Sequence, residues 1–195
     1  NVTTLKPSDI PYLRRKVDRV LTRAGFAPEG HLGKALVNML ETYPRDELFQ
    51  IDDETLYRFS VAILQLDERP RVRVLSRRDR FDRFVSVLVY LPRERAGGRV
   101  IEGIEKFLAG LYKGTISSFT PFFPEGPLVR IHFVIARSRE EIRSFDRATL
   151  EYGVGAIVRT WSDALSEALA LAHDPLKAKQ LFERYSAAFS AGYRD

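Results

Sequence analysis

The hydrophobic pattern of this chain changes period close to residue 70, and that change limits the folds it can adopt. Before residue 67, apolar residues recur every three or four positions, which indicates amphipathic helices. Between residues 71 and 136, two pairs of strand-like segments enclose one helical segment. After residue 138 the pattern is helical again. Because a sheet must bury its apolar face against another layer, the sequence predicts an α+β fold, with an antiparallel sheet flanked by N- and C-terminal helices.

Three helices are expected in the N-terminal part. The first follows the start signal Ser8-Asp9 and ends at Gly25, and the second lies around residues 36–40. The third has the clearest start, because Asp52 is a suitable N-cap for a helix over residues 53–66.

Two strand pairs are expected on either side of a central helix. The strands are predicted at 71–74, 84–91, 115–123 and 128–136, and the helix at 98–113. Gly114 is expected to end that helix. With the preceding helix, the order α-β-β-α-β-β is most of a ferredoxin-like split βαβ unit. A first strand either comes from the Phe49–Ile51 region or is missing.

The C-terminal part is expected to be helical. Ser138 and Glu141 form a capping-box pattern, one apolar stripe runs from Leu150 to Leu169, and Asp174-Pro175 starts a last helix. Gly153-Val154-Gly155 comes closest to a nucleotide-binding fingerprint, but it lacks the third glycine and follows a helix rather than a strand. We therefore expect these glycines to allow close helix packing or a kink.

Residue types that perform catalysis are scarce. Cys is absent, and the three histidines, His31, His132 and His173, lie far apart in the sequence. A base or nucleophile needs a neighbour that sets its pKa and orientation, and a metal needs several converging donors. We therefore predict no catalytic, cofactor-binding or metal site in this chain. His132 is expected to be exposed, on the sheet face opposite Ile131 and Phe133.

Positive charge is concentrated in one region. Ten arginines lie between residues 69 and 99, against three acids, in a chain of net charge +5. Such a region is a solvated sheet face and hairpin tip, or a surface for phosphates, carboxylate ligands or an acidic partner. In the second interpretation, Phe119, Phe122 and Phe123 would stack bases, although they also suit the core. The glycine–aromatic pattern of RNA-recognition domains is missing from residues 84–91.

The segment Tyr43–Gln50 is unusual because Pro44 interrupts the second helix. We interpret it as a polar turn that connects two helices, with Arg45 and Asp46 in a local ion pair. The alternative is a contact surface for another domain or for a ligand carboxylate, which arginine binds in bidentate fashion.

A set of sequence strings resembles the N-terminal half of the large bacterial NAD-specific glutamate dehydrogenases. These strings are Tyr43–Gln50, Asp79–Ser86, Val89–Arg95, Gly114-Thr115, Pro127–Phe133 and the helix around Trp161, and together they span residues 34–190. The resemblance implies a long multidomain polypeptide with ACT-like modules in its N-terminal region and a dehydrogenase domain far downstream. We therefore expect a helical segment over residues 1–48, an ACT-like domain over 49–137 and a second helical segment over 138–195.

The resemblance implies a regulatory and assembly role, without catalytic residues in this chain. NAD, the catalytic lysine and aspartate and the oxidative deamination of glutamate belong to the downstream domain. Expected partners are other domains of the polypeptide and further copies of the chain. An amino-acid effector at an unknown position is one alternative, and a purely architectural role is another. Nucleic-acid binding through the arginines at 69–99 is the alternative from a different class. No apolar run is long enough to span a membrane, and the absence of Cys fits the cytoplasm.

Overall fold

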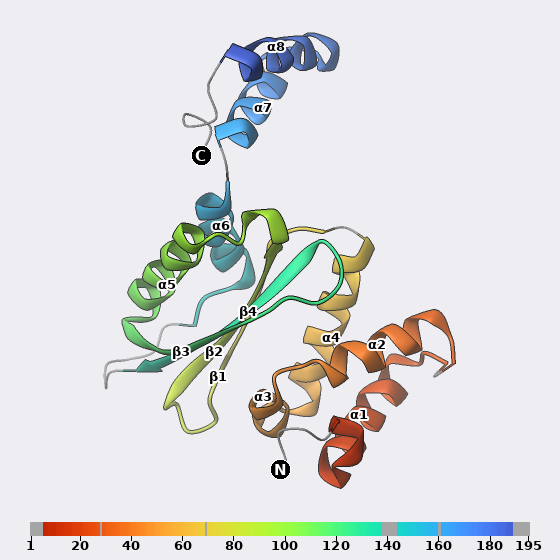
Figure 1. Cartoon of the computed structure of the whole chain (residues 1–195). Helices are drawn as coiled ribbons and strands as arrows, with labels where there is room; N and C mark the ends of the chain where they lie inside the picture. The colour runs from red at the N-terminus through yellow and green to blue at the C-terminus, as the bar shows by residue number, and fades with distance from the viewer. Residues whose placement is uncertain (1–5, 28, 69, 138–143, 160, 189–195) are drawn as a thin grey trace.

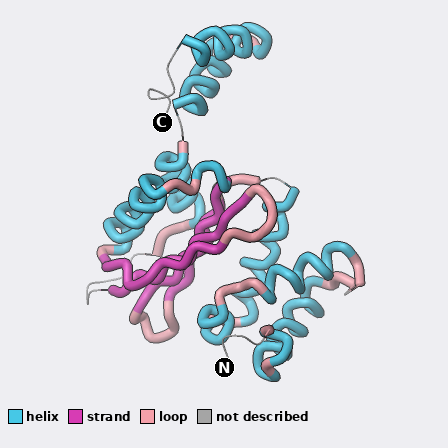
Figure 2. Tube along the Cα trace, viewed as in Figure 1, coloured by secondary structure: helices cyan, strands magenta, loops and turns pink. Residues whose placement is uncertain are grey.

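The structure is a computed structural model that describes residues 6–27, 29–68, 70–137, 144–159 and 161–188. A four-stranded antiparallel sheet lies between two helical layers, and a pair of C-terminal helices stands apart from this body (Figure 1; Figure 2). The predicted α+β fold with a ferredoxin-like, ACT-type sheet is confirmed.

The N-terminal layer is helical. Its elements are η1 (Pro7–Asp9), α1 (Pro11–Ala24), α2 (His31–Glu41), α3 (Arg45–Gln50) and α4 (Asp53–Glu68). Gly25 ends α1 in the left-handed region at φ 67°. Asp52 caps α4 as predicted, because its Oδ1 accepts a hydrogen bond from the Thr55 amide at 2.8 Å. The expected polar turn after Pro44 is instead the short helix α3, whose first turn contains Asp46 and Glu47 near the positive end of the helix dipole.

The sheet has the order β1-β2-β4-β3, with every neighbouring pair antiparallel. Its strands are β1 (Arg73–Arg78), β2 (Phe84–Pro92), β3 (Gly114–Phe122) and β4 (Leu128–Arg137). A strand at Phe49–Ile51 is wrong, since α3 ends at Gln50 and Ile51 is its C-cap. The helix α6 follows β4 in the chain and packs on β1. If only the four strands and the two helices α5 and α6 are followed in a circle from β4, their order is βαββαβ, which is the ferredoxin-like order with permuted ends.

One face of the sheet is covered by α5 (Gly98–Tyr112) and α6 (Arg147–Val158) (Figure 1). The predicted β4 stripe Val129, Ile131, Phe133 and Ile135 is fully buried there. Gly153 allows the two helices to approach closely, because a Cβ at that position would overlap the ring of Phe107. Gly114 does not end α5. Lys113 does so at φ 47°, and Gly114 lies where a Cβ would meet the Ala136 carbonyl oxygen at 2.5 Å.

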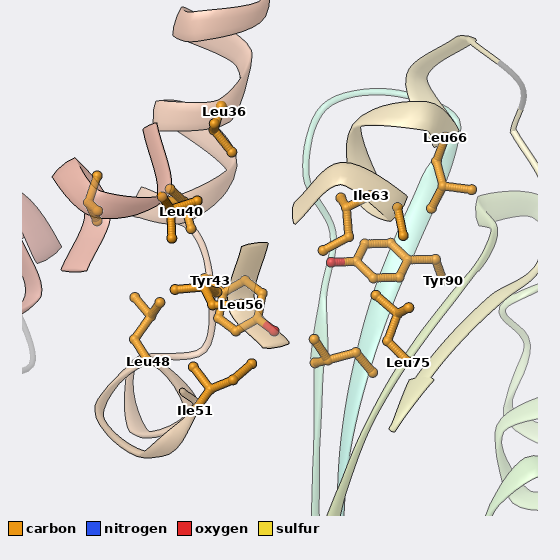
Figure 3. Close-up of a cluster of buried hydrophobic side chains, with 14 of the residues drawn as sticks. Leu36, Leu40, Tyr43, Leu48, Ile51, Leu56, Ile63, Leu66, Leu75 and Tyr90 are labelled. Atoms are coloured by element: carbon orange, nitrogen blue, oxygen red, sulfur yellow. The ribbon is translucent and has the colours of Figure 1, made fainter. Parts of the chain in front are cut away.

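The second face of the sheet packs against α1–α4. Leu75 of β1 and Leu88 and Tyr90 of β2 join a buried cluster with apolar residues of all four helices. Figure 3 shows Tyr43, Leu48 and Ile51 at one side of this cluster and Tyr90 with Leu75 at the other. The helices α1–α4 therefore form a second layer that uses the sheet as part of its own core.

The C-terminal stripe from Leu150 to Leu169 is divided between two helices. Arg159 has an extended conformation at the end of α6, and α7 (Trp161–Ala172) and α8 (Pro175–Ala188) follow as a pair. Asp174 caps α8 as expected, accepting from the Lys177 amide at 3.1 Å. The capping box at Ser138 and Glu141 lies outside the described residues. Over the part of the chain that the structure describes, no helix has the length and apolarity needed to cross a membrane.

Candidate functional site

A polar groove lies where the second sheet face passes beyond the cover of α1, α2 and α4. Strand alternation puts Arg130, His132 and Val134 of β4 on this face, opposite Phe122, Thr120 and Ser118 of β3. The strands β3 and β4 form one wall of the groove, and the helix α3 forms the opposite wall. The groove has a volume of about 690 Å³, which lies within the range of small-molecule sites.

The floor of the groove is organised by Glu47, whose side chain is 3% exposed. Its Oε1 accepts from the guanidinium of Arg77 on β1, and its Oε2 accepts from the hydroxyl of Ser86 on β2. His132 Nε2 on β4 lies 2.9 Å from Ser86 Oγ and 3.6 Å from Glu47 Oε2. One carboxylate on α3 is thus linked to three neighbouring strands.

These contacts keep Glu47 ionised. Burial alone would raise the pKa of its carboxyl, but the hydrogen bonding of His132, the charge of Arg77 and the Ser86 hydroxyl outweigh burial. The pKa is therefore held below its ordinary value of 4.5. Because a buried charge without a partner is very unfavourable, Glu47 and Arg77 depend on each other.

The contact among Ser86, His132 and Glu47 is not a nucleophilic triad. In a working triad the serine and the acid bind opposite ring nitrogens of the histidine. Here both Ser86 Oγ and Glu47 Oε2 approach Nε2. Ser86 is buried, and its hydroxyl already donates to the carboxylate. The arrangement therefore holds α3 on the sheet and activates no nucleophile.

Arg130 closes the other end of the groove and is 7% exposed. Its Nη2 donates to the Thr42 carbonyl at 2.8 Å, and its guanidinium lies 4.6 Å from the Phe122 ring centroid. Arg130 also bonds the hydroxyl of Tyr90, although burial is the main influence on that group and raises the pKa of Tyr90 to about 12. The connection between α2 and α3 is thus also attached to β4, through the hydrogen bond from Arg130 to the Thr42 carbonyl.

Lys16 of α1 binds the C-terminal end of α3. This side chain is 3% exposed, and its Nζ donates to the carbonyls of Leu48, at 2.8 Å, and Ile51. Burial lowers the pKa of the ammonium, and Asp53 opposes that effect. A cation at the C-terminal end of a helix also complements the helix dipole.

The rim of the groove carries groups of both charges. Arg45 and Asp46 begin α3, and Thr120, Ser118 and Gln50 add hydroxyl and amide groups. A cavity of this size, lined by both charges and by neutral hydrogen-bonding groups, suits a small zwitterion. Among the described residues, no three His, Asp or Glu side chains come together as a metal site.

The arginines at 69–99 do not form one basic face. Arg73 contacts Glu151 of α6 at 3.1 Å, Arg77 contacts Glu47, and Arg83 contacts Asp79 at 2.7 Å. Arg78 pairs with Asp82, Arg93 donates to the carbonyls of Pro124 and Gly126, and Arg95 pairs with Asp163 of α7. Phe119 stacks on Phe133, with ring centroids 6.2 Å apart. These contacts give no support to the nucleic-acid interpretation.

The three histidines lie in different places. His31 begins α2, His173 follows α7, and His132 lies on the sheet face opposite Ile131 and Phe133, as predicted. The expected exposure of His132 is wrong, because α3 covers it and leaves its side chain 13% exposed. Glu47 was missed as a site residue. No local sequence signal marks it, because its partners Arg77 and Ser86 lie 30 and 39 residues away.

Two family models match this chain. The model described as glutamate dehydrogenase, helical motif 1, matches residues 10–69, and the one described as glutamate dehydrogenase, ACT2 domain, matches residues 73–162. The first range contains all of α1–α4, and the second begins with the first residue of β1. The fold and the groove at the junction of these ranges define an ACT-type domain with a helical layer on its second face.

Three curated relatives carry the name NAD-specific glutamate dehydrogenase. The protein from Halomonas elongata is 37% identical over 97% of this chain, that from Pseudomonas aeruginosa 33% over 96%, and that from Mycobacterium tuberculosis 30% over 95%. The chain spans 12% of the length of each relative. The chain belongs to the glutamate dehydrogenase family that the two models describe, and corresponds to a segment of those long proteins.

Proposed function

We propose that this chain is a non-catalytic regulatory and assembly module of an NAD-dependent glutamate dehydrogenase. The reaction of the parent protein would be the conversion of L-glutamate, NAD and water to 2-oxoglutarate, ammonia and NADH, with NAD bound outside this chain. The match of residues 73–162 to the ACT2 domain carries the proposal. The use of Ser86, His132 and Glu47 for structural contacts supports a role other than chemistry.

The effector that we propose is an amino acid, bound in the groove beside α3. Such a ligand would contact α3 and the strands β3 and β4 at the same time. It would therefore distinguish arrangements of the helical layer on the sheet. A ligand shifts a conformational equilibrium only by its difference in affinity for the two states, so this dual contact is what would make binding regulatory.

The experiment uses the full-length parent enzyme with two matched substitutions on β3. Thr120→Trp fills the groove, whereas Thr115→Trp lies on the same sheet face outside the groove. Initial rates of NADH formation are measured against a panel of amino acids. We expect Thr115→Trp to keep the response of the wild type and Thr120→Trp to lose it. An unchanged response in Thr120→Trp would contradict the location of the effector site.

The non-catalytic role is tested separately with the 195-residue chain. Incubation with L-glutamate and NAD is expected to give no NADH absorbance at a protein concentration where the parent enzyme is readily measured. NADH formation by the purified chain would overturn the proposal. A purely architectural role would appear as an intact oligomer of the parent enzyme with no amino-acid response in any variant.

A further inference from the structure

A second cleft lies along the outer edge of β1, the edge strand at the opposite side of the sheet from β3. It has a volume of about 900 Å³, with walls from α1, the beginning of α4, β1 and residues 144–145. A hollow of about 540 Å³ continues along Val74–Ser76 toward α6. The cleft therefore follows the edge strand for most of its length.

The backbone of β1 presents hydrogen-bonding groups to this cleft. Leu75 and Arg77 lie opposite Leu88 and Ser86 in the ladder with β2, and hydrogen-bonded pairs alternate along an antiparallel ladder. The Asp79 amide donates to the Phe84 carbonyl at 2.9 Å, which sets the phase of this alternation. The backbone groups of Val74, Ser76 and Arg78 consequently point away from β2.

Glu151 shows which kind of chemical group binds at this edge. Its Oε1 lies 3.4 Å from the outward amide of Val74 and 3.1 Å from Nη1 of Arg73. A carboxylate from α6 thus binds an outward amide and an arginine of the same strand. Ser76 and Arg78, which carry the next outward groups along β1, line the cleft, and the Arg78 carbonyl accepts a long hydrogen bond from Nη1 of Arg77 at 3.4 Å.

The cleft carries an excess of positive charge. Its cations are Lys16, Arg19, Arg58, Arg77, Arg78 and Arg80, and its carboxylates are Asp52 and Asp53. Arg19 is paired with Asp53 at 2.6 Å. Arg58 and Arg80 are exposed and form no ion pair with any residue that the structure describes. Their charges are available to an acidic partner.

Each wall of the cleft contains an aromatic pair. Tyr12 and Phe49 stack on one wall with ring centroids 6.0 Å apart, and Tyr112 and Phe145 meet edge to face on the other at 5.3 Å. A strand added to a sheet edge turns alternate side chains to opposite faces. Its side chains would therefore meet one aromatic pair on each wall.

We propose that this edge binds an extended acidic peptide segment as a fifth strand of the sheet. The peptide backbone would pair with the outward groups of Ser76 and Arg78, and its carboxylates would face Arg58 and Arg80. Backbone pairing would supply affinity, while the arginines and the aromatic walls would supply specificity.

Other occupants fit the edge less well. A nucleic-acid backbone offers phosphate acceptors but no regular row of donors for the outward carbonyls of β1. A second copy of the chain would bring the consecutive arginines of two β1 strands together, and like charges across a strand pair are unfavourable.

The test measures fluorescence anisotropy of labelled ten-residue peptides with the 195-residue chain. The probes are an alternating Glu–Val peptide, the matched Lys–Val peptide, the Glu–Val peptide with alternate backbone amides methylated, and a single-stranded oligonucleotide of equal charge. We expect saturable binding of the Glu–Val peptide and at least tenfold weaker binding of the other three.

Substitutions locate the site. Arg58→Glu with Arg80→Glu is expected to weaken Glu–Val binding at least tenfold, whereas the matched control Arg99→Glu on α5 leaves it unchanged. Ser76→Pro removes an outward amide that does not pair with β2 and is expected to have the same effect as the double substitution. Equal affinity for the methylated peptide, tighter binding of the oligonucleotide, or binding that survives the double substitution would overturn the proposal.

Discussion

Replacing Glu47 by alanine is expected to destabilise this protein more than most single substitutions in its helical layer. The change removes the carboxylate that Arg77 and Ser86 contact and leaves the guanidinium of Arg77 buried, with its side chain 9% exposed. Breaking a buried ion pair at one partner typically costs about 3–5 kcal/mol. We therefore expect a loss of about 3–4 kcal/mol in the free energy of unfolding.

The assay is equilibrium unfolding in urea, followed by circular dichroism, with the slope of the transition compared between variants. Asp46→Ala is the matched control, since Asp46 is an exposed acid in the same turn of α3, and we expect a change within about 0.5 kcal/mol. The double variant Glu47→Leu/Arg77→Met is expected to recover most of the lost stability, because apolar residues can replace a buried pair at little cost. A loss below about 1 kcal/mol for Glu47→Ala would refute the reasoning.

The same contacts predict a dependence on pH. The pKa of Glu47 in the folded protein is below the ordinary value of 4.5, so its stabilisation is complete above that value and is lost as pH falls through the folded pKa. The difference in unfolding free energy between wild type and Glu47→Gln should therefore narrow as the pH is lowered below 4.5. A constant difference down to pH values where the protein unfolds in acid would contradict this.

Two further predictions concern packing. Gly153→Ala is expected to lower the free energy of unfolding by about 1–3 kcal/mol, because its methyl group would overlap Phe107. Gly155→Ala in the same helix has open space around it and should raise the free energy of unfolding by about 0.5–1 kcal/mol. Urea unfolding that gives both changes the same sign would contradict the close packing of α5 and α6. Lys16→Met is expected to lose about 2 kcal/mol because two carbonyls at the end of α3 lose a charged donor, and the exposed Arg15→Met should change little. Equal midpoints for these two variants would show that Lys16 does not hold α3.

The sequence predicts this fold well where the signal is local. The cap at Asp52 and the left-handed stop at Gly25 depend on a few neighbouring residues. Strand alternation also places His132 on the correct face. The burial of Glu47 could not be predicted in this way, because its partners Arg77 and Ser86 lie 30 and 39 residues away and its burial arises only when α3 packs on the sheet.

The break in the C-terminal stripe has a similar explanation. The apolar spacing from Leu150 to Leu169 is compatible with one helix, and no glycine or proline lies within three residues of Arg159. The helix nevertheless ends there, where Arg95 donates to the Val158 carbonyl and pairs with Asp163. An arginine more than 60 residues away in sequence supplies contacts on both sides of the break, and periodicity carries no information about such a contact.

The central claim, that an amino acid is sensed in the groove beside α3, is tested most directly by thermal unfolding of the 195-residue chain against a panel of amino acids. A ligand at about 100 times its dissociation constant adds about 2.7 kcal/mol of stability, which corresponds to about 5–10 °C in the midpoint for a domain of this size. We predict such a shift with at least one amino acid in the wild type and in Thr115→Trp, and its loss in Thr120→Trp. The absence of any shift across the panel, or a shift of equal size in Thr120→Trp, would contradict the claim.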